Sequence, residues 1–276
     1  MLGRSSRKAG LIAGGMLCGV LWGQDQGKRP LPPVTAGGLT IEEVLDQLQG
    51  NLSLYRSSVP DLFCNEHVVS AMESRRVRTE TVTDSTFRLR RLHREDGLVE
   101  FEESRVLRAV DGRVPVVDSE KLSGPAVLSG VFSDGLEVVS REVRGCYVYT
   151  MHPVRPGHPK DRIVVDFKNL PRAERAVGCP PFEETRGRAT IDPVTMHVVR
   201  LEKTTPDPTF GVERAATWTW TVDYGPVQMA GKMLWMPLTI WSVSRTDDGS
   251  YKWIFDGRYS NYHLFHAKSR IVPVEP

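Results

Sequence analysis

From Leu62 onward, apolar and polar residues alternate along short segments that glycine, proline, aspartate and asparagine separate. A period of two residues is typical of strands with one buried and one solvent-facing side. The clearest segment is Ala216 to Tyr224, where apolar residues take every second position and mostly threonine fills the others. So many strands exclude an α/β fold and predict a mainly β domain. The other clear strand segments are Arg162 to Lys168, Met196 to Lys203, Ser250 to Phe255, and Met233 to Val243, which is apolar on both faces.

Short turn sequences connect the predicted strands. Asp192 to Thr195 and Asp247 to Gly249 each separate two strand-like segments, and Asp111-Gly112 and Asp256-Gly257 have the same turn chemistry. Links this short join antiparallel neighbours, so the sheet is predicted to be mostly antiparallel.

Two helices are predicted beside the strands. Thr40 and Glu43 have the spacing of a capping box, and apolar residues then recur at helical spacing as far as Tyr55. Val59-Pro60 ends this amphipathic N-terminal helix, because the residue before proline is pushed out of the α region. A second, shorter helix is predicted from Leu122 to Leu136, with Ser123 as its cap and Pro125 in its first turn.

The first two dozen residues have the order of a secretory signal peptide. A positively charged start is followed by an apolar run, Ala9 to Trp22, and then by polar residues. The run is shorter than the about 20 residues that a membrane-spanning helix needs, which favours a cleaved signal over an anchor. Cys18 leaves lipid attachment as an alternative. We therefore predict an exported protein, periplasmic or associated with the outer membrane, with a signal peptide at residues 1–23 that is cleaved near Gly23 or Gln24, a flexible leader at 24–38, and one domain at 39–276.

Removal of the predicted signal changes the charge of the chain. The full sequence has 36 Lys and Arg against 34 Asp and Glu residues, and three of the basic residues belong to the signal. The mature chain of 253 residues would therefore carry a net charge near −1. No excess of positive charge remains to favour nucleic acid or an anionic membrane surface as a partner. No second hydrophobic stretch is long enough to span a membrane.

Three cysteines remain after processing: Cys64, Cys146 and Cys179. An exported protein meets conditions that permit disulfides, so we expect one disulfide among the three and one free or buried thiol. The sequence leaves all three pairings open.

The sequence contains no strong catalytic, cofactor or metal motif. The G-x-S-x-G pentapeptide and glycine-rich phosphate loops are both missing. His263 and His266 would lie on opposite faces of a strand, and His152 and His158 flank a loop without a third ligand. Cys64 has no identifiable base beside it. We predict no cofactor, no metal and no enzymatic activity, while the scattered carboxylates leave a secreted hydrolase of unrecognised type as an alternative.

A local basic run is explained by strand alternation. Arg88 and Arg90 would project into solvent from a strand whose Phe87 and Leu89 face inward. We therefore interpret the run as a paired, solvated face rather than a site for anions or nucleic acid. The acidic residues of the next predicted strand that could neutralise it are Glu100, Glu102 and Glu103.

Tryptophan is concentrated in the last quarter of the chain, mostly on consecutive predicted strands. Core packing is one interpretation of these residues. One sheet with two helices can hardly cover so broad an apolar face, however, and an uncovered apolar concavity binds apolar ligands. The residues predicted to line such a site are Trp218, Trp220, Val222, Leu238, Ile240 and Trp253.

The order of these segments resembles a known family. Val59 to Cys64 leads from a helix into long strands, and Gly187 to Thr195 with Val198 to Glu202 forms a strand, an Asp-Pro turn and a second strand. This order resembles the outer-membrane lipoprotein-sorting, or LolA-like, superfamily. The resemblance implies a strongly curved antiparallel half-barrel that cups a hydrophobic ligand, with helices plugging its open side.

Three functional hypotheses follow. The favoured one is a non-enzymatic periplasmic protein whose half-barrel binds a lipid, an acyl chain or another apolar ligand, or docks an envelope protein. The first alternative is an envelope protein-interaction module with a filled β core. The second is the hydrolase named above.

Overall fold

The structure of this chain is a computed structural model. It describes residues 38–94, 99–115, 124–152, 162–179, 184–207 and 216–265. The predicted signal peptide, its cleavage position, Cys18 and nearly all of the leader lie outside the described residues, as do His158 and His266.

Helix α1, Ile41–Ser58, has the predicted capping box at its start. The backbone N–H of Glu43 donates to the Thr40 hydroxyl over 3.3 Å, and the Glu43 carboxylate accepts from the Thr40 N–H over 2.7 Å. Val59 caps the other end in an extended conformation. The buried stripe consists of Val44, Leu45, Leu48 and Leu52.

Gly50 lies on the exposed side of α1. A methyl group there would meet nothing within 4 Å, and glycine is a poor helix former because it loses much conformational freedom on folding. Gly50→Ala is therefore expected to raise the free energy of unfolding by about 0.5–1 kcal/mol. Urea denaturation followed by far-UV circular dichroism would measure the gain, and an unchanged or lower midpoint would contradict it.

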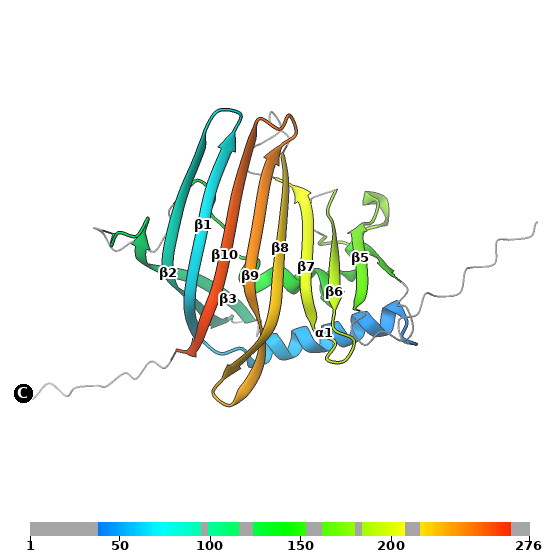
Figure 1. Cartoon of the computed structure of the whole chain (residues 1–276). Coiled ribbons are helices and arrows are strands. Elements are labelled where there is room, and N and C mark those ends of the chain that lie inside the picture. The colour runs from blue at the N-terminus through cyan, green and yellow to red at the C-terminus, as the bar shows by residue number, and fades with distance from the viewer. Residues whose placement is uncertain are drawn as a thin grey trace, which may run out of the picture. The chain divides into compact units, whose positions relative to one another are not determined.

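The strands form one open sheet in which every neighbouring pair is antiparallel (Figure 1). Its order is β3-β2-β1-β10-β9-β8-β7-β6-β5-β4, so β3 and β4 form the edges. The predicted mainly β, antiparallel half-barrel is confirmed. The strands are β1 Leu62–Ser74, β2 Arg78–His93, β3 Val99–Val110, β4 Tyr147–Met151, β5 Ile163–Asn169, β6 Arg186–Ile191, β7 Val198–Pro206, β8 Ala216–Met229, β9 Lys232–Thr246 and β10 Tyr251–Leu264.

Two of the four predicted turns join paired strands. Asp192 to Thr195 connects β6 to β7, and Asp247 to Gly249 connects β9 to β10. Asp111-Gly112 forms a turn after β3, but it leads only to an isolated bridge between Val110 and Arg113.

The prediction of a turn at Asp256-Gly257 is wrong. Both residues lie inside β10 and pair with Trp241 and Ile240 of β9. A Cβ at position 257 would stand 2.7 Å from the Phe255 ring, so glycine serves here to let that ring lie against the strand.

The second helix is shorter than predicted. Helix α2 covers only Val131–Asp134, and Pro125 lies in a non-helical stretch. Gly130 adopts a positive φ of 80° at the start of the helix, which stops the helix from extending toward Pro125. Two short 3₁₀ segments, Gly135–Val139 and Arg141–Cys146, follow α2. We call residues 124–146 the strap.

The strap packs against the inner face of the sheet. Ser70 of β1 exchanges two hydrogen bonds with the backbone of Ala126, at 2.7 and 2.8 Å. The Phe132 ring contacts Phe87 and Tyr259, with ring centroids 4.4 and 4.9 Å apart. The inner core therefore lies between the sheet and this segment.

A disulfide links the end of the strap to the loop after β5. It joins Cys146 to Cys179, whose Cα atoms are 5.5 Å apart. Cys64 is the buried free thiol, and burial raises its pKa well above the usual range. A buried, protonated thiol is a poor nucleophile.

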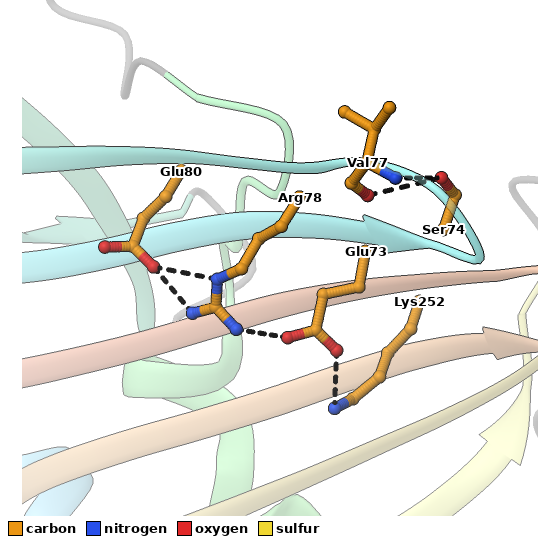
Figure 2. Close-up of polar contacts among 6 residues, drawn as sticks. All are labelled: Glu73, Ser74, Val77, Arg78, Glu80 and Lys252. Atoms are coloured by element: carbon orange, nitrogen blue, oxygen red, sulfur yellow. Dashed lines mark hydrogen bonds and ion pairs between the residues drawn. The ribbon is translucent and has the colours of Figure 1, made fainter.

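Charged residues pair across strands on the outer face. Figure 2 shows Glu73 of β1 between Arg78 of β2 and Lys252 of β10, with 3.1 Å from the Lys252 Nζ to the Glu73 carboxylate. Arg78 also donates to Glu80. The Arg78 pairs are exposed and the Glu73–Lys252 pair is partly buried, and together they link three adjacent strands at one end.

The predicted neutralisation of the Arg88–Arg90 run is confirmed in part. Arg90 pairs with Glu102 at 3.3 Å, while Glu103 points inward instead. Its carboxylate accepts the backbone N–H groups of Gly130 and Ser133 over 2.9 and 3.0 Å, and so fixes the start of α2. The inward position of Glu103 follows from β3 alternation, which places it on the same face as the buried Arg105.

Candidate ligand-binding site

An apolar pocket of about 480 Å³ lies between α1, the strap and the β8–β9 hairpin. A volume of this size is within the range of small-molecule sites. The lining is largely aliphatic and aromatic, with a few polar groups. The lining residues are Leu48, Asn51, Leu52, Leu54, Tyr55, Ser58, Leu136, Val139, His197, Val198, Lys232, Met233, Leu234 and Trp235.

The β8–β9 hairpin forms one wall of the pocket. Ala230 and Gly231, both with positive φ, build its tight turn. The turn sends Met233 to Trp235 back along the pocket. The indole N–H of Trp235 donates to the Val198 carbonyl over 2.8 Å. The same ring stacks on His197, with centroids 4.7 Å apart. The aromatic wall is therefore held in one orientation.

Helix α1 forms the opposite wall and is fixed at several points. Figure 1 shows it crossing the sheet near the ends of β6 and β7. The Asn51 side chain donates to the Met196 carbonyl over 2.5 Å, within the β6–β7 turn region. Asp46 accepts from Arg144 of the strap over 2.6 Å. These bonds hold the helix across the pocket rather than leaving it free to swing.

The rim of the pocket is apolar and exposed. Leu54 is 64 % exposed and Met233 is 61 % exposed, and both also line the pocket. Burial lowers the pKa of His197, so this ring is neutral at pH 7 and adds no charge to the lining. The pocket can therefore receive an apolar chain, with Lys232 as the cationic residue of its lining.

The predicted site residues do not lie together. Trp220, Val222 and Ile240 are buried in the core, at 4 %, 0 % and 1 % exposure. The strap covers this central part of the face, because Gly135 lies directly over Trp220 and Val222. Leu238 is partly exposed and contacts Gly225 instead.

Trp218 and Trp253 both line a second cavity of about 480 Å³, beside residues 125–129 of the strap. Its polar groups largely satisfy one another: the Trp218 indole donates to Ser242 over 2.8 Å, and Ser244 bonds to Asp207. This cavity is a weaker candidate for an apolar ligand than the first.

Sequence reasoning missed the first pocket, although signals for it were present. Leu54 lies off the buried stripe of its helix, and Met233 opens the segment that is apolar on both faces. The rim of the pocket is thus formed by apolar residues, Leu54 and Met233, at positions where the sequence pattern predicts exposure to solvent.

The described residues contain neither a cluster of metal-ligating side chains nor a helix that could span a membrane. Within them, no group of three or more His, Cys, Asp or Glu side chains could hold a metal ion. His263 instead stacks on Phe63, with ring centroids 5.2 Å apart. None of the helices in the described ranges is long and apolar enough to cross a membrane.

Comparison with known proteins gives structural neighbours only. No protein-family model matches the chain, and no curated protein matches it significantly. The chain is similar to a DUF1329 family protein from Desulfovibrio piger, with 10 % identity, a TM-score of 0.39, and 83 % of this chain and 95 % of that chain covered.

Two further neighbours come from lipoprotein-sorting groups. A domain named as an outer membrane lipoprotein-sorting protein from Vibrio parahaemolyticus is 11 % identical, with a TM-score of 0.35 over 80 % of this chain and 92 % of that chain. A LolA superfamily protein from Nitrosomonas europaea is 13 % identical, with a TM-score of 0.33 over 81 % and 94 %. The resemblance suggested by the sequence is thus confirmed among the neighbours. Because the TM-scores are low, no functional conclusion about this chain follows from them.

Proposed function

We propose that this chain is an exported periplasmic binding protein that holds an acyl chain or a similar apolar ligand in the pocket between α1, the strap and the β8–β9 hairpin. The observation that carries the proposal is the pocket itself: about 480 Å³, lined mainly by apolar side chains. Exposed Leu54 and Met233 at its rim add apolar surface where a ligand would enter.

The binding of N-phenyl-1-naphthylamine, a neutral dye that fluoresces in apolar surroundings, tests this proposal. The double variant Leu54→Asp/Met233→Asp places two carboxylates at the rim and is expected to weaken dye binding roughly tenfold. Both side chains are exposed, so the fold should tolerate the change. Fluorescence titration measures the affinity.

Val127→Asp is the matched control, because Val127 is 60 % exposed and lines the second cavity instead. It should leave dye affinity unchanged. If Val127→Asp weakens binding and the double variant does not, the ligand site is the second cavity and the proposal for the first pocket fails.

A second candidate function is an envelope protein-interaction module. The burial of Trp220, Val222 and Ile240 favours it, because a core filled by the chain's own side chains leaves that part of the face no room for a ligand. Native mass spectrometry that finds the exported protein consistently free of lipid, together with no dye binding, would favour this function over the carrier.

A further inference from the structure

We propose that the second cavity, beside residues 125–129 of the strap, binds a neutral sugar. This inference concerns a site other than the pocket of the proposed function and does not depend on that function. The cavity has a volume of about 480 Å³, within the range of small-molecule sites. Its lining combines aromatic rings with hydroxyl groups and a carboxylate, which come from Trp218, Trp253, Phe255, Ser242, Ser244 and Asp207.

The cavity lies where a small side chain of β9 separates two large rings of the neighbouring strands. Strands β8, β9 and β10 are adjacent in the sheet (Figure 1). Ser244 of β9 pairs with Trp218 of β8 and with Trp253 of β10. Neighbouring strands are spaced by about 4.8 Å, so the backbones of the two tryptophans are about 10 Å apart. The serine between them leaves space that a larger residue would fill.

The next inward-facing position of β9 repeats this arrangement. Ser242 pairs with Trp220 on one side and with Phe255 on the other. Alternation along β9 favours apolar residues at these buried positions, as at Ile240. Two successive serines instead put hydroxyl groups on the inner face, beside aromatic rings.

The hydrogen bonds of the two serines define what a ligand must offer. The Trp218 indole N–H donates to Ser242 over 2.8 Å, so Ser242 keeps its own proton to donate. Among the described residues, that proton has no acceptor. Ser244 donates its proton to the Asp207 carboxylate, so its oxygen can only accept from a ligand. A ligand that meets both serines must therefore accept and donate hydrogen bonds, as sugar hydroxyls do.

The rings and the charge of the lining narrow the ligand class further. Trp253 stacks on Tyr251, with ring centroids 5.7 Å apart, and the bond to Ser242 holds Trp218. The negative face of an aromatic ring attracts the C–H groups of a sugar ring. Among the described residues that line the cavity, none is Lys or Arg, so an acidic sugar would find no cation there. A plain hydrocarbon chain would leave the serine groups without partners.

The test is titration of the exported chain with four neutral disaccharides: cellobiose, maltose, lactose and N,N′-diacetylchitobiose. Isothermal titration calorimetry measures the affinity. At least one of the four should bind, and it should leave the affinity for N-phenyl-1-naphthylamine unchanged. The indole N–H signals of Trp218 and Trp253 in nuclear magnetic resonance spectra should shift on addition of that sugar. The signal of Trp235, which lines the first pocket, should stay in place.

The variant Ser242→Ala/Ser244→Ala removes both hydroxyl groups and keeps the rings. It should bind the sugar roughly tenfold more weakly and bind the dye as the wild type does. Ser58→Ala is the matched control, because Ser58 lines the first pocket instead, and it should not change sugar affinity.

Three results would overturn the inference. They are the absence of binding by all four sugars up to about 10 mM, an unchanged sugar affinity in the double serine variant, and a shift of the Trp235 signal in place of those of Trp218 and Trp253. If the double variant does not fold, the resonance shifts of the wild-type chain decide alone. None of these results changes the dye titration, so the proposed function stands or fails separately.

Discussion

Arg105→Met is expected to lower the free energy of unfolding by about 3–5 kcal/mol. Arg105 and Glu66 form an ion pair on the inner face of β3 and β1, with 2.9 Å between the Arg105 Nε and a Glu66 oxygen. Their residues are only 6 % and 1 % exposed. The substitution removes the positive charge and leaves the Glu66 carboxylate buried with only neutral donors such as Ser85.

Chemical denaturation at pH 7 would measure the loss. Arg90→Met is the matched control, since its pair with Glu102 is exposed and should contribute at most about 1 kcal/mol. Glu66→Leu/Arg105→Met should recover part of the lost stability, because the Glu66 carboxylate is gone. The buried Glu103 carboxylate, 3.8 Å from Arg105, still loses its cation in this variant. A single Arg105→Met variant within about 1 kcal/mol of the wild type would show that the carboxylate reaches water or another cation.

Gly187→Ala is expected to be nearly as damaging, at about 3 kcal/mol or more. A Cβ at position 187 would stand 2.1 Å from the Glu202 carbonyl oxygen and 2.3 Å from the Phe167 ring. The carbonyl belongs to the neighbouring strand β7, so relief requires a shift of the sheet backbone itself. Phe167 is 2 % exposed, so moving its ring would also disturb the core.

Thermal unfolding followed by circular dichroism would measure this effect. The matched control is Gly50→Ala, where the same methyl group meets open space. If Gly187→Ala melts at the wild-type temperature, then β6 can move away from β7 and the local packing is looser than the distances indicate.

The local elements were predictable because their signals are local. The capping box at Thr40 and the two-residue period of 216–224 depend on neighbours only a few residues apart. The pairing of β1 with β10 could not be read in this way, since it joins residues such as Val68 and Gly257. Nothing in the period of either strand specifies a partner so distant in sequence.

The candidate site was predictable in kind but not in place. An apolar pocket was expected, yet the tryptophan strands that suggested it lie mostly beneath the strap. The strap has too few apolar residues at regular spacing to predict where it packs. Its position depends on long-range hydrogen bonds, such as those with Glu103 and Ser70. The buried ion pair left a clearer signal in the sequence, because Glu66 is polar at a position where β1 alternation favours an apolar residue.

Because β1 pairs with β10, the sheet cannot be completed until the last strand has been synthesised. Strand β10 joins β3-β2-β1 to the strands from β9 to β4, so both groups keep an unpaired edge on the ribosome until β10 has emerged. Early fragments therefore cannot complete the native sheet. Until β10 is present, the unpaired edges of β1 and β9 are open to pairing with strands of other chains.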